Sequence, residues 1–216
     1  MSKKSIVQEP EVLIEEIRTS KRVKVGILGG TFNPPHMGHL MMAEQVKDQL
    51  DLDKIFFMPT AEPPHSSVTK TTISSEKRVH MLELATIDNP DFEIERFEVD
   101  NGGKNYTYDT MKALIELYPT VEFYFIVGGD MIVDMPTWYK IDELVQLVQF
   151  VGVNRPGYLV ETDYSIIMVD IPSIDISSST IRKKVGQNCS IKYLVPDDVR
   201  NYIALEGLYQ DDETTD

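Results

Sequence analysis

The sequence predicts an α/β fold built on a doubly wound, mostly parallel sheet. Short apolar runs rich in β-branched and aromatic residues alternate with segments whose apolar residues recur at helical spacing. The 216 residues are 42% hydrophobic, which is enough for one sizeable core. Linkers, repeats and low-complexity blocks are not visible in the sequence. We therefore expect one domain over residues 21–208, with an N-terminal extension (1–20) and an acidic C-terminal tail (209–216).

The individual elements follow from the same patterns. Expected strands are apolar runs bounded by turn-forming residues, at 23–28, 54–59, 91–99, 121–127, 150–153 and 166–169. Expected helices follow residues 36, 74, 108, 138, 177 and 196. Their N-terminal caps are predicted from residue type: Ser74 or Ser75, Thr107 or Asp109, and Ser177. Ligands of an open parallel sheet bind beyond the carboxyl ends of its strands, so the loops that follow these strands should form the site.

The loop at 29–39 follows the first predicted strand and carries two histidines. Pro34 and Pro35 disfavour helix before residue 37, so His36 should lie in the loop and His39 in the first helical turn. Gly29, Gly30 and Gly38 allow close backbone approach, and a helix start offers N–H groups and a positive dipole end. These features together predict an anion site.

The same loop contains a specific signature. It lacks the glycine patterns of dinucleotide-binding turns and P-loops. It fits G-x-F-x-P-x-H-x-G-H through Gly30, Phe32, Pro34, His36, Gly38 and His39, which resembles the nucleotidyltransferase signature. The alternative, a Gly/Pro turn with two solvated histidines, explains fewer of these positions.

A second signature lies near the end of the chain. Residues 176–182 fit I-S-x-S-x-x-R, with Ile176, three serines and Arg182. Alone, this would be an ordinary Ser-capped helix. Serine hydroxyls, free helix N–H groups and an arginine one turn later can also hold a phosphate chain, and the pairing with the histidine loop favours that function.

Three further polar positions leave alternatives open. Asp130 follows the strand predicted at 121–127 and either contacts a ribose or caps the next turn. His65 lies in another loop on the expected ligand side, whereas His80 is interpreted as a surface or packed helical residue.

The segment at 1–20 is interpreted as a mobile tail, a patch on the domain or an oligomer contact.

Composition excludes several classes of function. The formal net charge of −14 argues against a broad nucleic-acid footprint, and the single Cys189 forbids an intrachain disulfide. The sequence shows neither a signal peptide nor a membrane span, so we expect a cytoplasmic protein that does not bind membranes. A homo-oligomer is left open.

Together, the two signatures and the segments between them resemble the bacterial nicotinate-nucleotide adenylyltransferases over residues 22–208. The supporting segments are 63–65, 104–110, 125–131, 138–144 and 151–157. Two positions depart from the pattern: Ser66 replaces a frequent lysine, and Gly129 replaces a frequent alanine. The first departure leaves the role of His65 in doubt.

The resemblance implies a Rossmann-like nucleotidyltransferase fold and adenylyl transfer from ATP to nicotinate mononucleotide. The catalytic residues would be His36, His39 and Arg182, and Mg²⁺ would be carried by the ATP phosphates without a dedicated protein site. The implied ATP-binding residues are Gly29, Gly30, Thr31, Phe32, Gly38, Gly128, Asp130, Ile176, Ser177, Ser178 and Ser179. The implied mononucleotide-binding residues are Lys104, Tyr106, Thr107, Trp138, Tyr139 and Arg155.

Other functions remain to be separated from this one. A related transferase acting on phosphopantetheine, glycerol phosphate or flavin mononucleotide would share both signatures, and so would a non-catalytic ATP-binding module. Trp138 favours a flat pyridine ring over a pantetheine chain because an aromatic side chain can stack on it. The alternative for Trp138 is a partly buried core residue.

Overall fold

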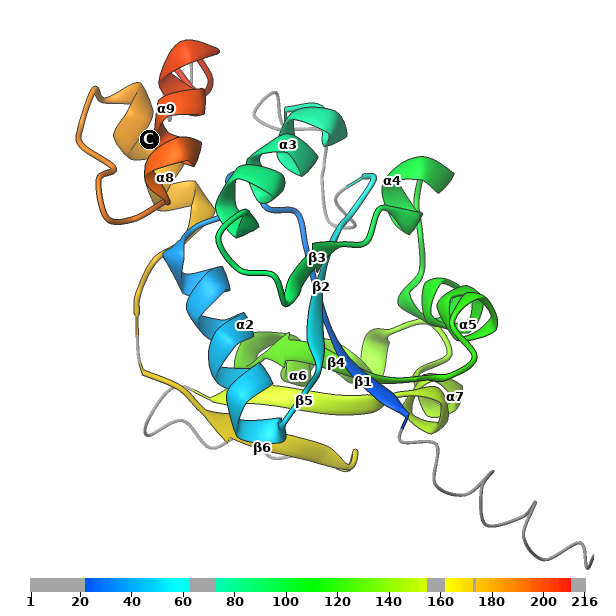
Figure 1. The fold of residues 1–216 in the computed structure, drawn as a ribbon. Helices are drawn as coiled ribbons and strands as arrows, with labels where there is room; N and C mark the ends of the chain where they lie inside the picture. The colour runs from blue at the N-terminus through cyan, green and yellow to red at the C-terminus, as the bar shows by residue number, and fades with distance from the viewer. Residues whose placement is uncertain (1–21, 63–72, 155–161, 173, 211–216) are drawn as a thin grey trace, which may run out of the picture.

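The computed structural model describes residues 22–62, 73–154, 162–172 and 174–210, and these form a six-stranded parallel sheet flanked by helices (Figure 1). The predicted α/β class is therefore confirmed, and all described strand pairings are parallel. The strands are β1 (Val23–Gly30), β2 (Lys54–Pro59), β3 (Phe92–Ile94), β4 (Val121–Gly128), β5 (Gln149–Asn154) and β6 (Ile166–Asp170). The helices are α2 (Met37–Leu50), α3 (Ser75–Thr86), α4 (Phe97–Asn101), α5 (Thr107–Leu117), α6 (Gly129–Asp134), the 3₁₀ turn η1 (Met135–Thr137), α7 (Ile141–Leu147), α8 (Ser178–Gly186) and α9 (Asp197–Leu205).

The strand order is β3-β2-β1-β4-β5-β6, so the direction of winding reverses between β1 and β4. These two strands pair in parallel, with Val23 opposite Val121 and Leu28 opposite Ile126. Their carboxyl ends therefore lie side by side. In doubly wound sheets this reversal opens the crevice where ligands bind.

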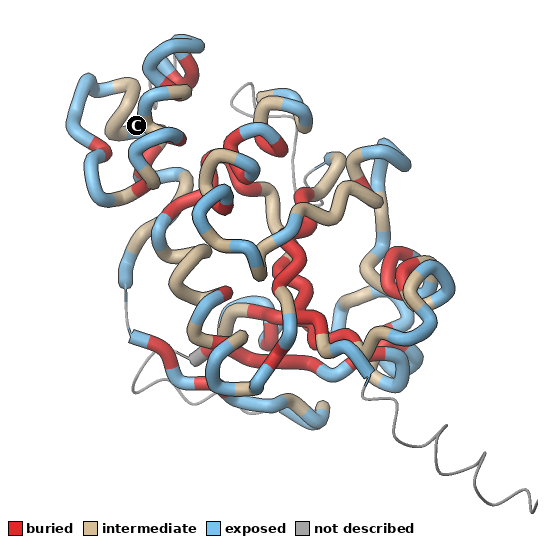
Figure 2. Tube along the Cα trace, in the orientation of Figure 1, coloured by how far each residue is buried: buried red, intermediate tan, exposed pale blue. Residues whose placement is uncertain are grey.

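Helices cover both faces of the sheet, which explains why its central strands read as nearly continuous apolar runs. On one face, Ala43 and Val46 of α2 and Leu82 of α3 pack against Leu28, Phe57, Ile126 and Val151. On the other, α5, α6, η1 and α7 contribute Met111, Leu114, Ile132, Met135 and Leu144, which pack against Ile27, Phe125 and Phe150. The buried segments in Figure 2 run along the sheet and along the inner sides of these helices. No helix in the described ranges is long and apolar enough to cross a membrane.

A third apolar cluster joins the C-terminal helices to α3. Its buried members are Met81, Ile181, Ile191, Val195, Val199, Ile203, Leu208 and Tyr209. It docks α8, α9 and the turn after α9 beside α3, away from the sheet's main layers (Figure 1). This cluster brings residues from late in the chain close to the loop that follows β1.

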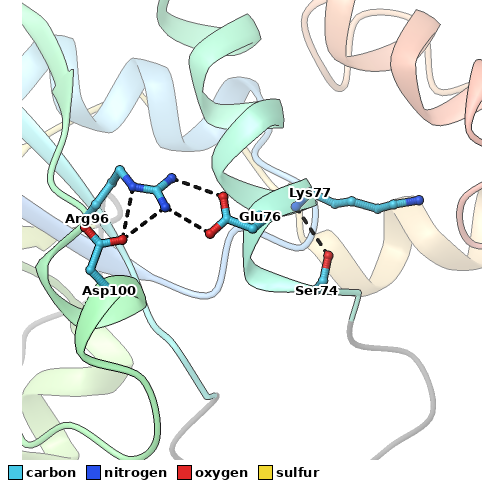
Figure 3. Close-up of polar contacts among 5 residues, drawn as sticks. All are labelled: Ser74, Glu76, Lys77, Arg96 and Asp100. Carbon is cyan, nitrogen blue, oxygen red and sulfur yellow. Dashed lines mark hydrogen bonds and ion pairs between the residues drawn. The ribbon is translucent and has the colours of Figure 1, made fainter.

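The strand predicted at 91–99 is too long. Only Phe92–Ile94 forms β3, and Phe97–Asn101 forms the short helix α4. A Glu95 carboxylate oxygen accepts the backbone N–H of Phe97 at 2.9 Å, which starts a helix instead of extending the strand. Arg96 then pairs with Asp100 one turn later and with Glu76 of α3, so side-chain contacts support the turn (Figure 3).

The predicted cap of α5 and the loop predicted after β4 also require correction. Helix α5 begins at Thr107 without a side-chain cap, and the preceding turn is held by Asn105, whose amide donates to the backbone oxygens of Gly102 and Gly103 at 3.2 Å. Both glycines have positive φ, at 69° and 61°. After β4 the chain enters α6 directly at Gly129, and α7 does not begin until Ile141.

Candidate active site

The candidate site lies where β1 and β4 end, at the reversal of the strand order. The histidine loop leaves β1 after Gly30 and leads into α2 at Met37. Gly128 ends β4, and α6 begins at Gly129. Because β1 and β4 are paired neighbours, both segments border the crevice that the topology provides.

The rings of His36 and His39 are stacked, with centroids 3.6 Å apart and an interplanar angle of 21°. His36 is the N-cap of α2 and is buried, and its backbone N–H donates to Nδ1 of His39 at 3.2 Å. This acceptor role places the proton of a neutral His39 on Nε2. A Cβ at Gly38 would lie 3.1 Å from Nδ1 of His36, so glycine leaves room for that ring.

Both imidazoles favour the neutral form. Burial lowers the pKa of His36 to about 4. Burial, together with the neighbouring His36, lowers the pKa of His39 well below its usual value. The buried Nδ1 of His36 has no hydrogen-bond partner among the described residues. A phosphate bound beside the stacked pair would raise both pKa values, since a nearby anion favours the imidazolium.

The glycines and Phe32 set the shape of the loop. Gly29 and Gly30 are the last residues of β1, and Thr31 follows them half-buried. Phe32 has a φ of 50° and is buried, with its ring edge-on to His39 at 5.0 Å. A Cβ on Gly30 would lie 3.2 Å from that ring. Phe32 thus packs against His39, and its predicted contact with ATP stays a prediction.

Helix α8 brings the second signature against the histidine loop. Nη1 of Arg182 donates to the backbone oxygen of Asn33 at 2.9 Å, and Oγ of Ser178 donates to that of Pro34 at 2.8 Å. Ser177 is the N-cap, as predicted, and its Oγ accepts the N–H of Thr180 at 3.2 Å. The two motifs, far apart in sequence, therefore form one structural unit. Ser178 joins the motifs, a role that residue type alone did not reveal.

The other residues of this signature lie around the helix start. Oγ of Ser179 is 3.0 Å from Oγ of Ser177, and both residues are exposed. Ile176 is half-buried and packs against the C-terminal apolar cluster. Ser177 and Ser179 are consequently the exposed serines of this signature.

Asp130 is exposed in the first turn of α6. A Cβ on Gly128 would lie 2.8 Å from Oδ1 of Asp130, so this glycine lets the carboxylate fold back over the end of β4. The N-cap of α6 is Gly128, without a side-chain cap hydrogen bond. The geometry thus gives no support to the capping alternative, and ribose binding by Asp130 stays a prediction.

A cluster of tyrosines and lysines forms at the start of α5. The rings of Tyr106 and Tyr139 are 4.8 Å apart, and Nζ of Lys104 lies 4.8 Å from the Tyr106 centroid. Thr107 is the first residue of α5. The structure thus gathers four of the residues predicted to bind the mononucleotide. It adds Lys140, whose Nζ lies 5.4 Å from the Tyr139 centroid and which sequence reasoning missed.

Trp138 has a packing role in this structure. It is half-buried and meets Phe125 and Phe150 edge-on, at centroid distances of 6.1 and 6.2 Å. Packing and ligand stacking are compatible for a half-buried ring, so the predicted stacking stays a prediction. Arg155 and His65 lie outside the described residues.

His80 is a surface residue, as predicted. It is exposed, its Nδ1 lies 3.2 Å from a Glu83 carboxylate oxygen, and its ring meets Tyr202 edge-on at 4.7 Å.

Sequence reasoning also missed the residues behind the loop. Asn33 is buried, and its Oδ1 accepts the hydroxyl of Tyr209 at 2.8 Å. Arg78 is buried and donates to the backbone oxygen of Thr31. The sequence did offer one signal for Arg78. It directly precedes Val79 on the apolar side of the predicted helix, where a charged residue is unusual.

Comparisons with known proteins agree with this arrangement. Residues 27–184 match the Cytidylyltransferase-like family. The chain is 53% identical over 212 residues to a probable nicotinate-nucleotide adenylyltransferase of Enterococcus faecalis, covering 97% of this chain and 96% of that protein. It is 51% identical over 198 residues to one from Streptococcus pyogenes serotype M1, covering 92% and 94%. The fold is similar to that of Plasmodium falciparum nicotinic acid mononucleotide adenylyltransferase complexed with NaAD, with a TM-score of 0.72, 24% identity and coverage of 87% and 97%.

Proposed function

Because the chain belongs to the nicotinate-nucleotide adenylyltransferases, we propose that it transfers the adenylyl group of ATP to nicotinate mononucleotide. The products are nicotinate adenine dinucleotide and pyrophosphate, in a step of NAD biosynthesis. The observation that carries the proposal is the contact of Arg182 with the histidine loop, which joins both signatures at the reversal of the strand order.

The proposed reaction needs no covalent intermediate on the protein. A phosphate oxygen of the mononucleotide attacks the α-phosphorus of ATP. A new P–O bond forms while the bond from the α-phosphorus to the oxygen bridging the β-phosphorus breaks, and pyrophosphate leaves with that electron pair. Catalysis then consists of alignment and stabilisation of the charge that builds on the leaving group.

The proposed roles follow from the geometry. His39 would donate from Nε2 to a phosphate oxygen, because its Nδ1 is already an acceptor. His36 would contribute positive charge after protonation, because its Nδ1 is buried and cannot contact a ligand directly. Arg182 would add a fixed positive charge from the first turns of α8.

We further propose that Mg²⁺ enters with ATP. Mg²⁺ at nucleotides is often held by phosphate oxygens and water with few protein ligands. No group of three or more His, Cys, Asp or Glu side chains suited to a metal occurs among the described residues. Mg²⁺ held in this way would neutralise phosphate charge, while the residues named above position the phosphate chain.

The acceptor would occupy the aromatic cluster at the start of α5. A nicotinate ring stacked on Trp138 would direct its carboxylate toward the N–H donors of the 104–109 segment. A carboxamide places its NH₂ against those donors and loses about 1.5 to 3 kcal/mol per disrupted bond. We expect a preference for the acid over the amide of at least about 10²-fold in kcat/KM.

Pyrophosphate release from ATP tests the proposal. Nicotinate mononucleotide, nicotinamide mononucleotide and phosphopantetheine serve as acceptors, with ATP alone as the control. Release with nicotinate mononucleotide and at least about 10²-fold less with its amide would support the proposed acceptor. A preference for phosphopantetheine would reassign the acceptor, and no release with any mononucleotide would overturn the function.

A further inference from the structure

Arg78 is a buried cation that holds two strand ends. Its Nη1 donates to the backbone oxygen of Thr31 at 2.8 Å, and its Nη2 donates to those of Thr60 and Ala61 at 2.7 and 3.0 Å. Thr31 follows β1, whereas Thr60 and Ala61 follow the neighbouring β2, and the N–H of Thr60 donates to Gly30. Burial lowers the pKa of Arg78, and none of the ion pairs among the described residues involves it.

A buried guanidinium without a carboxylate is costly, because burial removes its hydration. An apolar side chain would fill the same space, but it could not bind three carbonyl oxygens from two strands. The three hydrogen bonds of Arg78 therefore act mainly to fix the backbone conformation after β1 and β2, and not to stabilise the core.

Tyr209 supports the same loop from the C-terminal cluster. It follows α9 with a φ of 64°, and it is 7% exposed. Its hydroxyl donates to Oδ1 of Asn33, while Arg182 donates to the backbone oxygen of the same residue. Asn33 is thus held through its side chain and its backbone, three residues before His36.

We propose that Tyr209 and Arg78 are positioning residues, which hold the histidine loop in its reactive shape without touching substrate. The inference rests on the proposed function. Tyr209 fixes Asn33 within the loop, and Arg78 fixes the point where the loop leaves β1. A loop that shifts would misplace His36 and His39 relative to the leaving group. Misplacement of catalytic groups by about 1 Å can cost about 10²-fold in rate.

Tyr209→Phe is the sharpest test, because it removes one hydroxyl and keeps the ring in the apolar cluster. We expect kcat to fall by about 10-fold or more, with KM for ATP changed by less than about threefold. The matched control is Tyr202→Phe, which removes a hydroxyl from a half-buried tyrosine of the same cluster. We expect kcat of that variant to stay within about twofold of the parent.

Arg78→Lys and Arg78→Met supply a second comparison. Lysine keeps the charge but cannot bridge carbonyls from two strands with a planar fork. If Arg78 acts by positioning, both variants should lose kcat, and Lys should restore part of the loss seen with Met. Melting temperatures and assays well below them separate alignment from unfolding.

Two results would overturn the inference. One is a Tyr209→Phe enzyme whose kcat lies within about twofold of the parent; the other is a loss that appears only as a raised KM for ATP or only near the melting temperature. Assays of the parent enzyme distinguish failure of this inference from failure of the proposed function. A parent that releases no pyrophosphate rejects the function, whereas an active parent with an equally active Tyr209→Phe rejects the positioning role alone.

Discussion

Two stacked, neutral imidazoles in the proposed phosphate site imply that binding of the ligand is coupled to binding of protons. The pKa of His36 is about 4 in the free site and that of His39 is also lowered, so both rings are neutral at pH 7. A bound phosphate chain raises both values. ATP binding should therefore take up protons, and its affinity should increase as the pH falls from about 8 to 6.

Calorimetry of ATP binding in buffers of different ionisation enthalpy measures this uptake directly. A variant with His36→Gln and His39→Gln serves as the control, since titration of ATP itself contributes equally in both proteins. Equal proton uptake by parent and variant would contradict the prediction.

Substitution at His39 should affect the chemical step more than binding. We expect His39→Ala to lower kcat by about 10²-fold or more with a modest change in KM for ATP, because charge on the leaving group is greatest in the transition state. Arg182→Ala should behave similarly. Arg182→Lys separates two roles, since it keeps a charge but weakens the fixed contact with Asn33. Steady-state kinetics decide the matter, and near-normal kcat in either alanine variant would refute the phosphate clamp.

At the scale of single elements, α4 carries a buried carboxyl whose ionisation costs stability. Glu98 is buried and accepts the Thr110 hydroxyl at 3.0 Å, and burial raises the pKa of its carboxyl. A raised native pKa means that stability is greatest below the unfolded value and is lost as the pH rises through the native value. Glu98→Gln mimics the neutral form. We expect a higher melting temperature than the parent at pH 8 and little difference near pH 4.

Thermal unfolding at the two pH values checks this expectation. Exposed Glu116→Gln on α5 provides a control for the loss of one negative charge. A variant that is less stable than the parent at pH 8 would show that the charged form of Glu98 is the favoured one.

The elements differ in how well the sequence predicted them, for physical reasons. The strand at 121–127 was predictable because residues 123–127 form a continuous run of aromatic and β-branched side chains, which is typical of a strand buried on both faces. The 91–99 prediction failed because the Glu95 side chain accepts the backbone N–H of Phe97, where α4 begins, and Arg96 pairs with Glu76 of α3. These contacts depend on the folded chain.

The site shows the same division. Local motifs revealed His36, His39 and Ser177, whose roles depend on near neighbours. Arg78 and Tyr209 act on residues 47 and 176 positions away, and no short pattern records such a pairing. Trp138 was predicted only in part. Its residue type indicated contact with another ring, but could not show whether that ring belongs to Phe125 or to a ligand.

At the scale of the whole molecule, the net charge of the protein has the same sign as the charges of the proposed substrates. The formal net charge is −14, whereas ATP and the mononucleotide are anions. Long-range repulsion should slow their encounter at low ionic strength, because the Debye length is then about 30 Å. We expect kcat/KM for ATP to rise about twofold to fivefold between roughly 10 and 150 mM monovalent salt.

Kinetics at constant free Mg²⁺, with sucrose replacing salt as the viscosity control, test this expectation. A steady fall of kcat/KM over the same range would show that local positive groups at the site dominate the field that substrate experiences.

The contacts of Asn33 with Arg182 and Tyr209 also set an order of events during synthesis. A ribosome makes residues 23–128, which include β1, the histidine loop and β4, before it makes α8 and the turn after α9. A nascent chain can thus pair its central strands while the loop still lacks both supports. Competence for adenylyl transfer should therefore appear late, only after Tyr209 has left the exit tunnel. A ribosome-bound chain would then not consume ATP before its synthesis is nearly complete.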